Sequence, residues 1–244
     1  MRHISMANFP SVLLLGATGL VGSHCLRLLQ SHEGFARIVV LTRRPLDAGI
    51  AGPKVEAHVV DFDHLTSASR FFAVDQIICA LGTTMKLAGS RSAFRTVDLR
   101  YPLTAAHLGV EKRVSHFLVV SSIGADPRSL IFYNRVKGEL EKGLKALKYR
   151  SLTIARPSVL MGKRDQPRTS ERIAAGISFL APQRIRPIAA TDVAAAIVHQ
   201  AWVDEPGVKI LEVRQLLQIA RDSGSVVADV SRVAPAIIAK TSVA

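Results

Sequence analysis

Residues 12–22, VLLLGATGLVG, decide the fold of this chain. A short apolar run that ends in glycine is typical of a buried strand. Apolar residues then recur at helical spacing from Leu20 to Leu29, which predicts a helix directly after the glycines. The three glycines therefore stand where a strand turns into a helix. In an open parallel sheet this is the place that binds the phosphates of a nucleotide.

Each glycine of this turn has an expected role. Gly16 permits the tight turn, and Gly22 lets the helix pack closely. Gly19 lets the backbone approach a pyrophosphate, and we expect a positive φ there. Free amides and the helix dipole then attract the anion, although a glycine-rich turn without a ligand is the alternative. The other cofactor contacts expected in the turn are Thr18, Leu20 and Val21.

The end of the next strand bears on the choice of cofactor. Residues 38–41 form an apolar run that ends in Thr42-Arg43-Arg44. Proteins that bind NAD often place a carboxylate at this point, to hold the ribose 2′-hydroxyl. Two guanidinium groups suit a 2′-phosphate instead. We therefore expect NADP(H) to be preferred over NAD(H), which stays possible if both arginines are ordinary surface charge.

Two further strand ends are expected at the same edge of the sheet. The strand at 57–60 is followed by Asp61 and Phe62, which are placed to flank an adenine. The strand at 77–80 is followed by Leu81 and Gly82, where the backbone can approach the cofactor. Ligands of open parallel sheets lie at this edge.

A candidate catalytic set follows the strand at 117–120. This strand ends in Ser121-Ser122, and Tyr133 and Lys137 stand downstream, four residues apart and so on one face of a helix. A tyrosine hydroxyl, with a pKa of ~10, is a poor acid-base catalyst at neutral pH. A nearby ammonium favours the phenolate. Ser122 can hydrogen-bond a substrate carbonyl while Tyr133 moves a proton and a cofactor moves hydride.

These motifs together resemble a known family. The chain is similar to the short-chain dehydrogenase/reductase superfamily in its atypical branch, and more narrowly to the Tat-interacting-protein-like group of NADP(H)-binding Rossmann proteins. The similarity covers residues 10–165 with specific motifs and extends more loosely to about residue 215. The motifs that carry it are residues 16–22, 80–84, 94–98, 120–125, 133–139 and 156–160.

The resemblance implies a fold and a set of site residues. It implies one α/β domain over 1–244, a doubly wound parallel sheet with a small substrate-side lobe at about 157–215. It implies bound NADP(H), with Lys137 also holding the nicotinamide ribose. One departure is Asp98, which stands where many members carry an asparagine that supports the lysine. This departure puts the proton-relay part of the implied mechanism in doubt, but not the binding of the cofactor. The implied active-site triad is Ser122, Tyr133 and Lys137. The segment implied to lie against the nicotinamide is Pro157, Ser158 and Val159.

Composition agrees with one globular domain. The chain has 244 residues, of which 48% are hydrophobic, too many for a disordered chain. Its two cysteines, Cys25 and Cys79, fall within expected core elements and indicate a reducing compartment without a disulfide or metal framework. No apolar stretch near the N-terminus predicts a signal peptide, and none reaches the length of a membrane span. We therefore expect a cytoplasmic protein that does not bind a membrane.

The net charge of +13 raises the question of nucleic-acid binding. The basic clusters are short and scattered, as at Arg43-Arg44, Lys112-Arg113 and Lys163-Arg164. Nucleic-acid binders concentrate charge on one face and carry a recognisable module, which is not found here. We expect no nucleic-acid partner, because a solvated surface and an anionic cofactor account for the charge.

The C-terminal third is less informative. Residues 168–181 and 191–202 have helical spacing, and 208–213 resemble a strand. Residues 218–244 are a tail with no assigned role. The helix from Leu140 is suited to packing in a homodimer or, equally, to facing solvent. Four arginines are candidates for an anionic substrate or for plain exposed charge: Arg168, Arg172, Arg184 and Arg186.

Three functions from different classes are consistent with these motifs. The first is an NADP(H)-dependent reductase or dehydrogenase that acts on a small carbonyl or alcohol. The second is a nucleotide-sugar epimerase or dehydratase, against which the short C-terminal lobe argues. The third is a regulatory protein that senses NADP(H) with little turnover, against which the intact Ser122, Tyr133 and Lys137 argue. The substrate itself is not specified, because one fold supports many chemistries.

Overall fold

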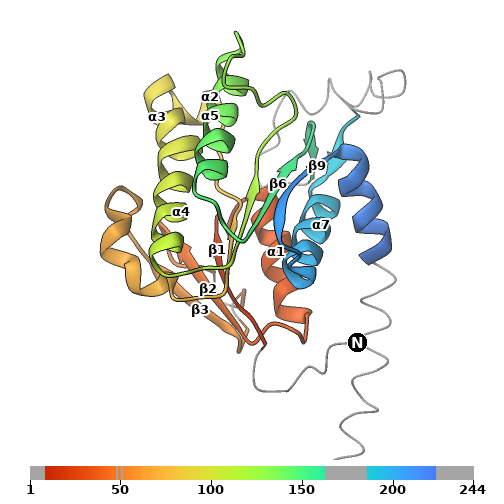
Figure 1. The fold of residues 1–244 in the computed structure, drawn as a ribbon. Coiled ribbons are helices and arrows are strands. Elements are labelled where there is room, and N and C mark those ends of the chain that lie inside the picture. Colours follow the sequence, from red (N-terminus) through yellow and green to blue (C-terminus); the bar gives the residue numbers. More distant parts are fainter. Residues whose placement is uncertain (1–8, 48, 51, 163–185, 224–244) are drawn as a thin grey trace, which may run out of the picture.

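The central feature of the molecule is a seven-stranded sheet with the order β3-β2-β1-β4-β5-β6-β9, in which every neighbouring pair is parallel (Figure 1). The computed structural model describes residues 9–223 except 48, 51 and 163–185. This is the doubly wound Rossmann fold expected from the glycine turn. The strands are β1 (Ser11–Leu15), β2 (Arg37–Thr42), β3 (Val55–Val59), β4 (Gln76–Cys79), β5 (His116–Val120), β6 (Ser151–Arg156) and β9 (Gly207–Glu212).

The apolar run that opens the chain is buried on both sides. Val12 and Leu14 point into one core, and Leu13 and Leu15 point into the other. Alternate residues of a strand face opposite sides, so a strand between two helix layers is apolar throughout. This explains why the run shows no alternation of apolar and polar residues.

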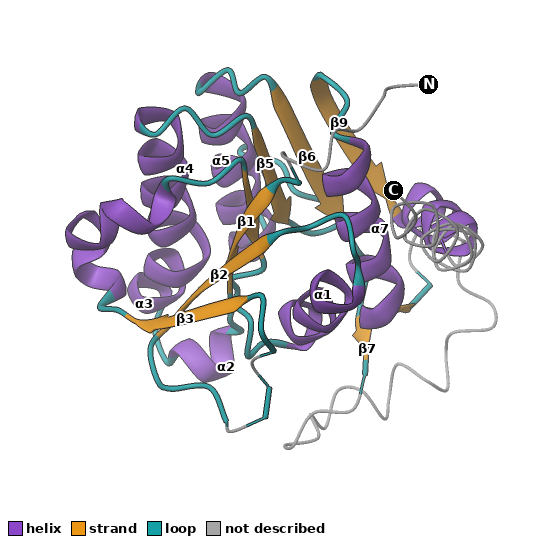
Figure 2. Ribbon diagram, turned by 90° about the horizontal axis from the view of Figure 1, so that it is seen from below, coloured by secondary structure: helices purple, strands orange, loops and turns teal. Residues whose placement is uncertain are grey.

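Helices cover both faces of the sheet (Figure 2). One core contains side chains of α1 (Leu20–Ser31) and α7 (Ala190–Val203), which pack against each other. The opposite core contains side chains of η1 (Phe62–Phe72), α4 (Tyr101–Glu111) and α5 (Phe132–Ala146). Short helices α2 (Met85–Ala88) and α3 (Arg91–Arg95) and a π-helical turn, η2 (Thr96–Arg100), lie between β4 and α4.

The chain changes its direction of winding at β1. Strand β1 has β2 on one side and β4 on the other, so the loops after β1 and β4 leave the sheet on opposite faces. A crevice opens between two such loops, and ligands of this fold bind there. The fold therefore places the glycine turn at the switch point of the sheet.

The C-terminal part contributes to the main sheet and to a small second one. Strand β7 (Leu160–Met161) pairs with β8 (Ile188–Ala189). The expected helix at 191–202 is α7, and the expected strand at 208–213 is β9, so these parts of the substrate-side lobe belong to the central layers. Residues 213–223 are helical. The expected helix at 168–181 lies outside the described residues.

The two cysteines lie in the core. Cys25 and Cys79 are both buried, as expected for core residues. Among the residues that the structure describes, no helix is long and apolar enough to cross a membrane.

Candidate functional site

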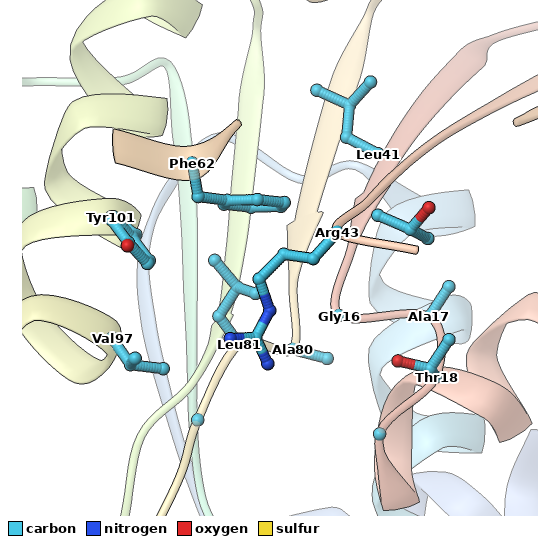
Figure 3. Close-up of a pocket in the computed structure, with 13 residues that line it drawn as sticks. Gly16, Ala17, Thr18, Leu41, Arg43, Phe62, Ala80, Leu81, Val97 and Tyr101 are labelled. Carbon is cyan, nitrogen blue, oxygen red and sulfur yellow. The ribbon is translucent and has the colours of Figure 1, made fainter. Parts of the chain in front are cut away.

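A cavity of about 210 Å³ lies at the switch point, between the loops after β1, β2 and β4 (Figure 3). The glycine turn forms one wall, and side chains of η1, η2 and α4 form the opposite wall. The residues that line it are Gly16, Ala17, Thr18, Gly19, Leu41, Thr42, Arg43, Phe62, Ala80, Leu81, Gly82, Val97 and Tyr101.

Two of the three glycines are required by packing. Gly16 has a φ of +85°, and a Cβ there would lie 2.6 Å from the carbonyl oxygen of Ala80. A Cβ on Gly22 would lie 2.0 Å from the carbonyl oxygen of Gly16. Both distances are far inside van der Waals contact, so only glycine fits either position. The expected roles of Gly16 in the turn and of Gly22 in close packing are thus seen in the geometry.

Gly19 is different, because its backbone does not require glycine. Its φ is −81° and its ψ is 171°, so the expected positive φ is wrong. A Cβ there would have its nearest neighbour, the carbonyl oxygen of Gly16, at 3.2 Å. Gly19 is also the N-cap of α1, which has no side-chain cap and no acidic residue in its first turn. Such an uncapped N-terminus, facing a cavity, fits a phosphate.

The two arginines after β2 have different positions. Arg43 lines the cavity, and Figure 3 shows its side chain pointing inward between the glycine turn and Phe62. Arg44 is exposed and is not among the lining residues. Only one of the two guanidiniums expected to meet a 2′-phosphate is therefore at the cavity.

The wall opposite the glycines is aromatic. Phe62 and Tyr101 both line the cavity, with ring centroids 5.6 Å apart. Asp61, expected beside the adenine, instead accepts a hydrogen bond from the Asp63 amide at 2.8 Å and caps η1. The Tyr101 hydroxyl donates to Asp63 Oδ1 at 2.9 Å, which fixes that ring. Phe62 thus lines the cavity, and Asp61 is not among the lining residues.

Several lining residues were missed by sequence reasoning. Val97 and Tyr101 are four apart and so share a helical face that points toward the sheet, a spacing that could have identified them. The missed lining residues are Ala17, Leu41, Thr42, Ala80, Val97 and Tyr101. Conversely, Leu20 and Val21 are buried in the core beside the turn.

Lys137 is held in a buried ion pair. Its side chain is 3% exposed, and its Nζ lies 2.8 Å from Asp98 Oδ1 and 3.5 Å from the Val120 carbonyl oxygen. Burial acts to lower the pKa of this lysine, but the charge of Asp98, followed by that of Tyr133, outweighs burial. The pKa of Lys137 is therefore raised, and the side chain carries its charge at neutral pH.

Asp98 belongs to the π-helical turn η2, a geometry that is frequent at functional sites. Its side chain is 1% exposed, and its Oδ2 accepts a hydrogen bond from the Thr83 amide at 2.8 Å. The residue that departs from the family pattern is therefore the direct partner of Lys137.

Tyr133 and Ser122 complete the candidate catalytic set. Tyr133 stands one turn before Lys137 on α5, and its ring packs against Phe94 with centroids 5.5 Å apart. Ser122 follows β5, and its Oγ has only a long contact, 3.4 Å, to the carbonyl oxygen of Ile123. Both side chains are half-buried and therefore accessible to a ligand at the carboxyl edge of the sheet.

A second buried ion pair fixes the surrounding strands. Glu141, on α5, accepts hydrogen bonds from Ser121 Oγ at 2.6 Å and from Arg156 Nη2 at 2.6 Å. The hydrogen bonds that Arg156 donates to Glu141 raise the pKa of Arg156. Ser121 directly follows β5 and precedes Ser122, and Arg156 is the last residue of β6. This cluster, which sequence reasoning missed, ties both strand ends to the helix of Tyr133 and Lys137.

The segment expected against the nicotinamide starts beside the serine turn. The carbonyl oxygen of Pro157 accepts a hydrogen bond from the Ile123 amide at 2.9 Å. Ser158 Oγ donates to the Arg186 carbonyl oxygen, and Val159 is exposed. None of Pro157, Ser158 and Val159 lines the described cavity. Arg168, Arg172 and Arg184 lie outside the described residues.

Comparison with known proteins identifies relatives for most of the chain. A family profile described as NAD(P)H-binding matches residues 16–202. Protein HTATIP2 of Rattus norvegicus is 37% identical over 166 residues, 67% of this chain and 68% of that protein. The mitochondrial protein FMP52-1 of Scheffersomyces stipitis is 31% identical over 225 residues, 86% of this chain and 98% of that protein. The mitochondrial protein fmp52 of Emericella nidulans is 34% identical over 174 residues, 69% of this chain and 73% of that protein.

Solved structures agree on the fold. MoeE5 in complex with UDP-glucose and NAD has a TM-score of 0.66 at 16% identity, covering 87% of this chain and 81% of that chain. The structure of gox2253 also has a TM-score of 0.66, at 20% identity, covering 87% and 75%. At these identities the likeness concerns the fold alone.

The relatives overturn one expectation. Several of them are named mitochondrial proteins, in Emericella, Scheffersomyces, Meyerozyma and Coccidioides. The cytoplasmic location expected from composition is therefore contradicted. Two buried cysteines do not specify a compartment.

The fold, the uncapped glycine turn and the comparisons agree. The family profile covers more than half of the chain, and HTATIP2 is 37% identical over 67% of it. The chain belongs to the NAD(P)H-binding family, in the atypical short-chain dehydrogenase/reductase branch that includes HTATIP2 and FMP52.

Proposed function

We propose that the protein is an NADP(H)-dependent oxidoreductase that acts on a small carbonyl or alcohol through Ser122, Tyr133 and Lys137. The observation that carries the proposal is the charged Lys137, buried one helical turn from Tyr133 at the edge of the sheet that holds the dinucleotide cavity. Burying a charge is costly unless it is paired, and the pairing with Asp98 keeps an ammonium one helical turn from the tyrosine that would act as the acid.

The residues at the cavity suit NADP(H). The uncapped N-terminus of α1, which follows Gly19, would receive the pyrophosphate. Arg43 would meet the 2′-phosphate, and Phe62 would lie against the adenine. Lys137 would hold the nicotinamide ribose. The bound cofactor supplies the hydride, and the protein supplies its orientation.

The side chains beyond the cavity would move the proton. Ser122 would donate a hydrogen bond to the carbonyl oxygen of the substrate and so orient it. Tyr133 would donate its phenolic proton to the same oxygen as the carbonyl is reduced. The Lys137 ammonium would stabilise the negative charge left on the phenol oxygen. In the direction of alcohol oxidation the same groups would work in reverse.

The test is a screen of NADPH oxidation with small aldehydes, ketones and quinones, followed by Tyr133→Phe on any substrate found. We expect turnover to fall by roughly 10²–10⁴ with NADPH affinity nearly unchanged, because only the acid is removed. Tyr149→Phe is the matched control, since the Tyr149 hydroxyl donates to the Ala106 carbonyl oxygen within the core. It should retain parental turnover.

Two results would count against the proposal. Turnover of a substrate by Tyr133→Phe at the parental rate would remove the tyrosine from the mechanism. Tight binding of NADPH, with no substrate in a broad screen, would favour a cofactor-sensing role.

A further inference from the structure

The Asp98–Lys137 pair joins two parts of the site that are far apart in sequence. Asp98 lies on η2, Lys137 lies on α5, and both are buried. We infer that Asp98 is a positioning residue: its carboxylate keeps the Lys137 ammonium charged and in place, and links it to the cofactor-facing loop after β4. The role of Lys137 toward the cofactor rests on the proposed function, whereas the pair itself does not.

Asp98 and Lys137 each contact a further group besides each other. An ammonium has three donors. The Lys137 Nζ lies 2.8 Å from Asp98 Oδ1 as an ion pair, and it donates one long hydrogen bond, 3.5 Å, to the Val120 carbonyl oxygen. A donor therefore remains for a ligand such as a ribose hydroxyl. The other carboxylate oxygen, Oδ2, accepts from the Thr83 amide, so Asp98 is engaged on both sides.

The charge of Asp98 is what balances the burial of the lysine. The other titratable groups that act on Lys137 are Tyr133 on its own helix and Cys79 at the end of β4, and both are neutral when protonated. Glu141 also lies on α5, but its carboxylate is engaged by Ser121 and Arg156. An asparagine at position 98 would keep a hydrogen-bond acceptor but would remove this counter-charge.

The same carboxylate contacts the wall of the cavity. Leu81 and Gly82 line the cavity, and Thr83, whose amide Asp98 holds, follows them directly. A Cβ on Gly82 would lie 3.5 Å from Asp98 Oδ1, so the loop packs onto the carboxylate. One side chain thus sets both the position of the lysine and that of the loop beside the cofactor.

The test is Asp98→Asn, with the urea midpoint of unfolding measured from pH 6 to pH 9.5. Without its counter-charge, the buried lysine would have a folded-state pKa below its unfolded value. The unfolded state would then bind more protons across that interval, and stability would rise with pH. We expect the variant to be less stable than the parent at pH 6, and we expect this deficit in the urea midpoint to shrink as pH rises. A deficit that is constant with pH would overturn the inference.

Glu141→Gln is the matched control. It makes the same carboxylate-to-amide change at a side chain that is equally buried. The cations it leaves are Arg156 and the exposed Lys145, whose Nζ lies 3.9 Å from Glu141 Oε2. The guanidinium does not lose its proton in this range, and Lys145 stays hydrated with or without the carboxylate. The deficit of Glu141→Gln should therefore stay constant with pH. A deficit that shrinks as much as that of Asp98→Asn would show that the effect is not specific to Lys137.

A double variant covers the case in which Asp98→Asn does not fold. Asp98→Asn/Lys137→Met removes both charges, so it should fold and show no pH-dependent deficit. If the double variant is as unstable as the single variant, the carboxylate is not there to balance the lysine.

The link to the cofactor has its own measurement. NADPH fluorescence titrations should show affinity about tenfold weaker or more for Asp98→Asn than for the parent, because the one acceptor oxygen of asparagine cannot serve both the lysine and the loop after β4. Parental affinity combined with the expected stability profile would retain the charge pair and overturn its link to the cofactor. A parent that does not bind NADPH would overturn the proposed function instead.

Discussion

The two ends of β5 carry buried polar clusters that behave in opposite ways. At the amino end, His116 lies with its Nε2 2.9 Å from Thr153 Oγ1 and its Nδ1 3.0 Å from Asp204 Oδ1. Burial, followed by the charges of Arg150 and Lys209, lowers the pKa of His116 to about 3. This base is neutral at physiological pH, whereas Lys137, which packs over the carboxyl end, stays charged.

The difference lies in how each base is paired. Asp204 also forms an ion pair with Arg150, so its carboxylate already has a cationic partner besides His116. Asp98 has Lys137 as its ion-pair partner and is itself 1% exposed. A buried base keeps its charge only where a carboxylate is available for it. We therefore expect substitutions at the carboxyl end to change ligand binding, and those at the amino end to change stability alone.

The largest effect is expected at the glycine turn. Gly19→Val should weaken NADPH and NADH binding by about 100-fold or more, because its side chain would take the space that the pyrophosphate needs at the N-terminus of α1. Stability should remain near that of the parent, since the φ of −81° suits any residue. Calorimetric titration would measure the affinity for each cofactor, and urea unfolding would measure the stability. Parental NADPH affinity in a folded variant would place the phosphate site elsewhere.

A smaller effect separates the two arginines after β2. Arg43→Ala should weaken NADPH binding tenfold or more with little effect on NADH, since a charge-assisted contact contributes about 1.5–3 kcal/mol. Arg44→Ala removes the same charge from a residue that does not line the cavity, so it serves as the control. Equal affinity of the parent for both cofactors would contradict the expected preference for NADP(H).

The smallest effect on cofactor binding is expected at the amino end of the sheet. The folded-state pKa of His116 is lowered, so the unfolded state binds the extra proton between about pH 6.5 and 3. Stability is then lost as pH falls through this window, by at most about 1.4 kcal/mol per pH unit. His116→Gln should make the acid side of the stability profile shallower without changing NADPH affinity. The exposed His107→Gln is the control, and an equal change there would rule out His116.

Sequence reasoning was most reliable where the cause is local. The apolar runs identified β1, β2, β4 and β5, because burial on both faces leaves a continuous apolar pattern. The expected positive φ of Gly19 was wrong, because spacing alone does not show which of several glycines must have a positive φ. Gly16 has it because its turn lies against Ala80 of another strand, and that contact is not written in the motif.

The side-chain clusters of the site were less accessible. Asp98 was noticed only as a departure, because its partner Lys137 lies far along the chain and meets it only through the packing of η2 and α5. Glu141 and Arg156 were missed for the same reason. Arg44 and Asp61 show the converse, since a residue can follow the correct strand and still face solvent.

The single tryptophan gives the molecule a built-in optical reporter. Trp202 lies near the end of α7, its ring centroid 4.9 Å from that of His32 and 6.1 Å from that of Phe35. Beside it, the carbonyl oxygen of Ala201 accepts a hydrogen bond from Gln76, the first residue of β4. Trp202 is therefore at the amino end of the sheet, opposite the cavity. Its emission should follow the separation of α1 from α7 on unfolding, while the emission of NADPH follows the other end, so one sample can report both.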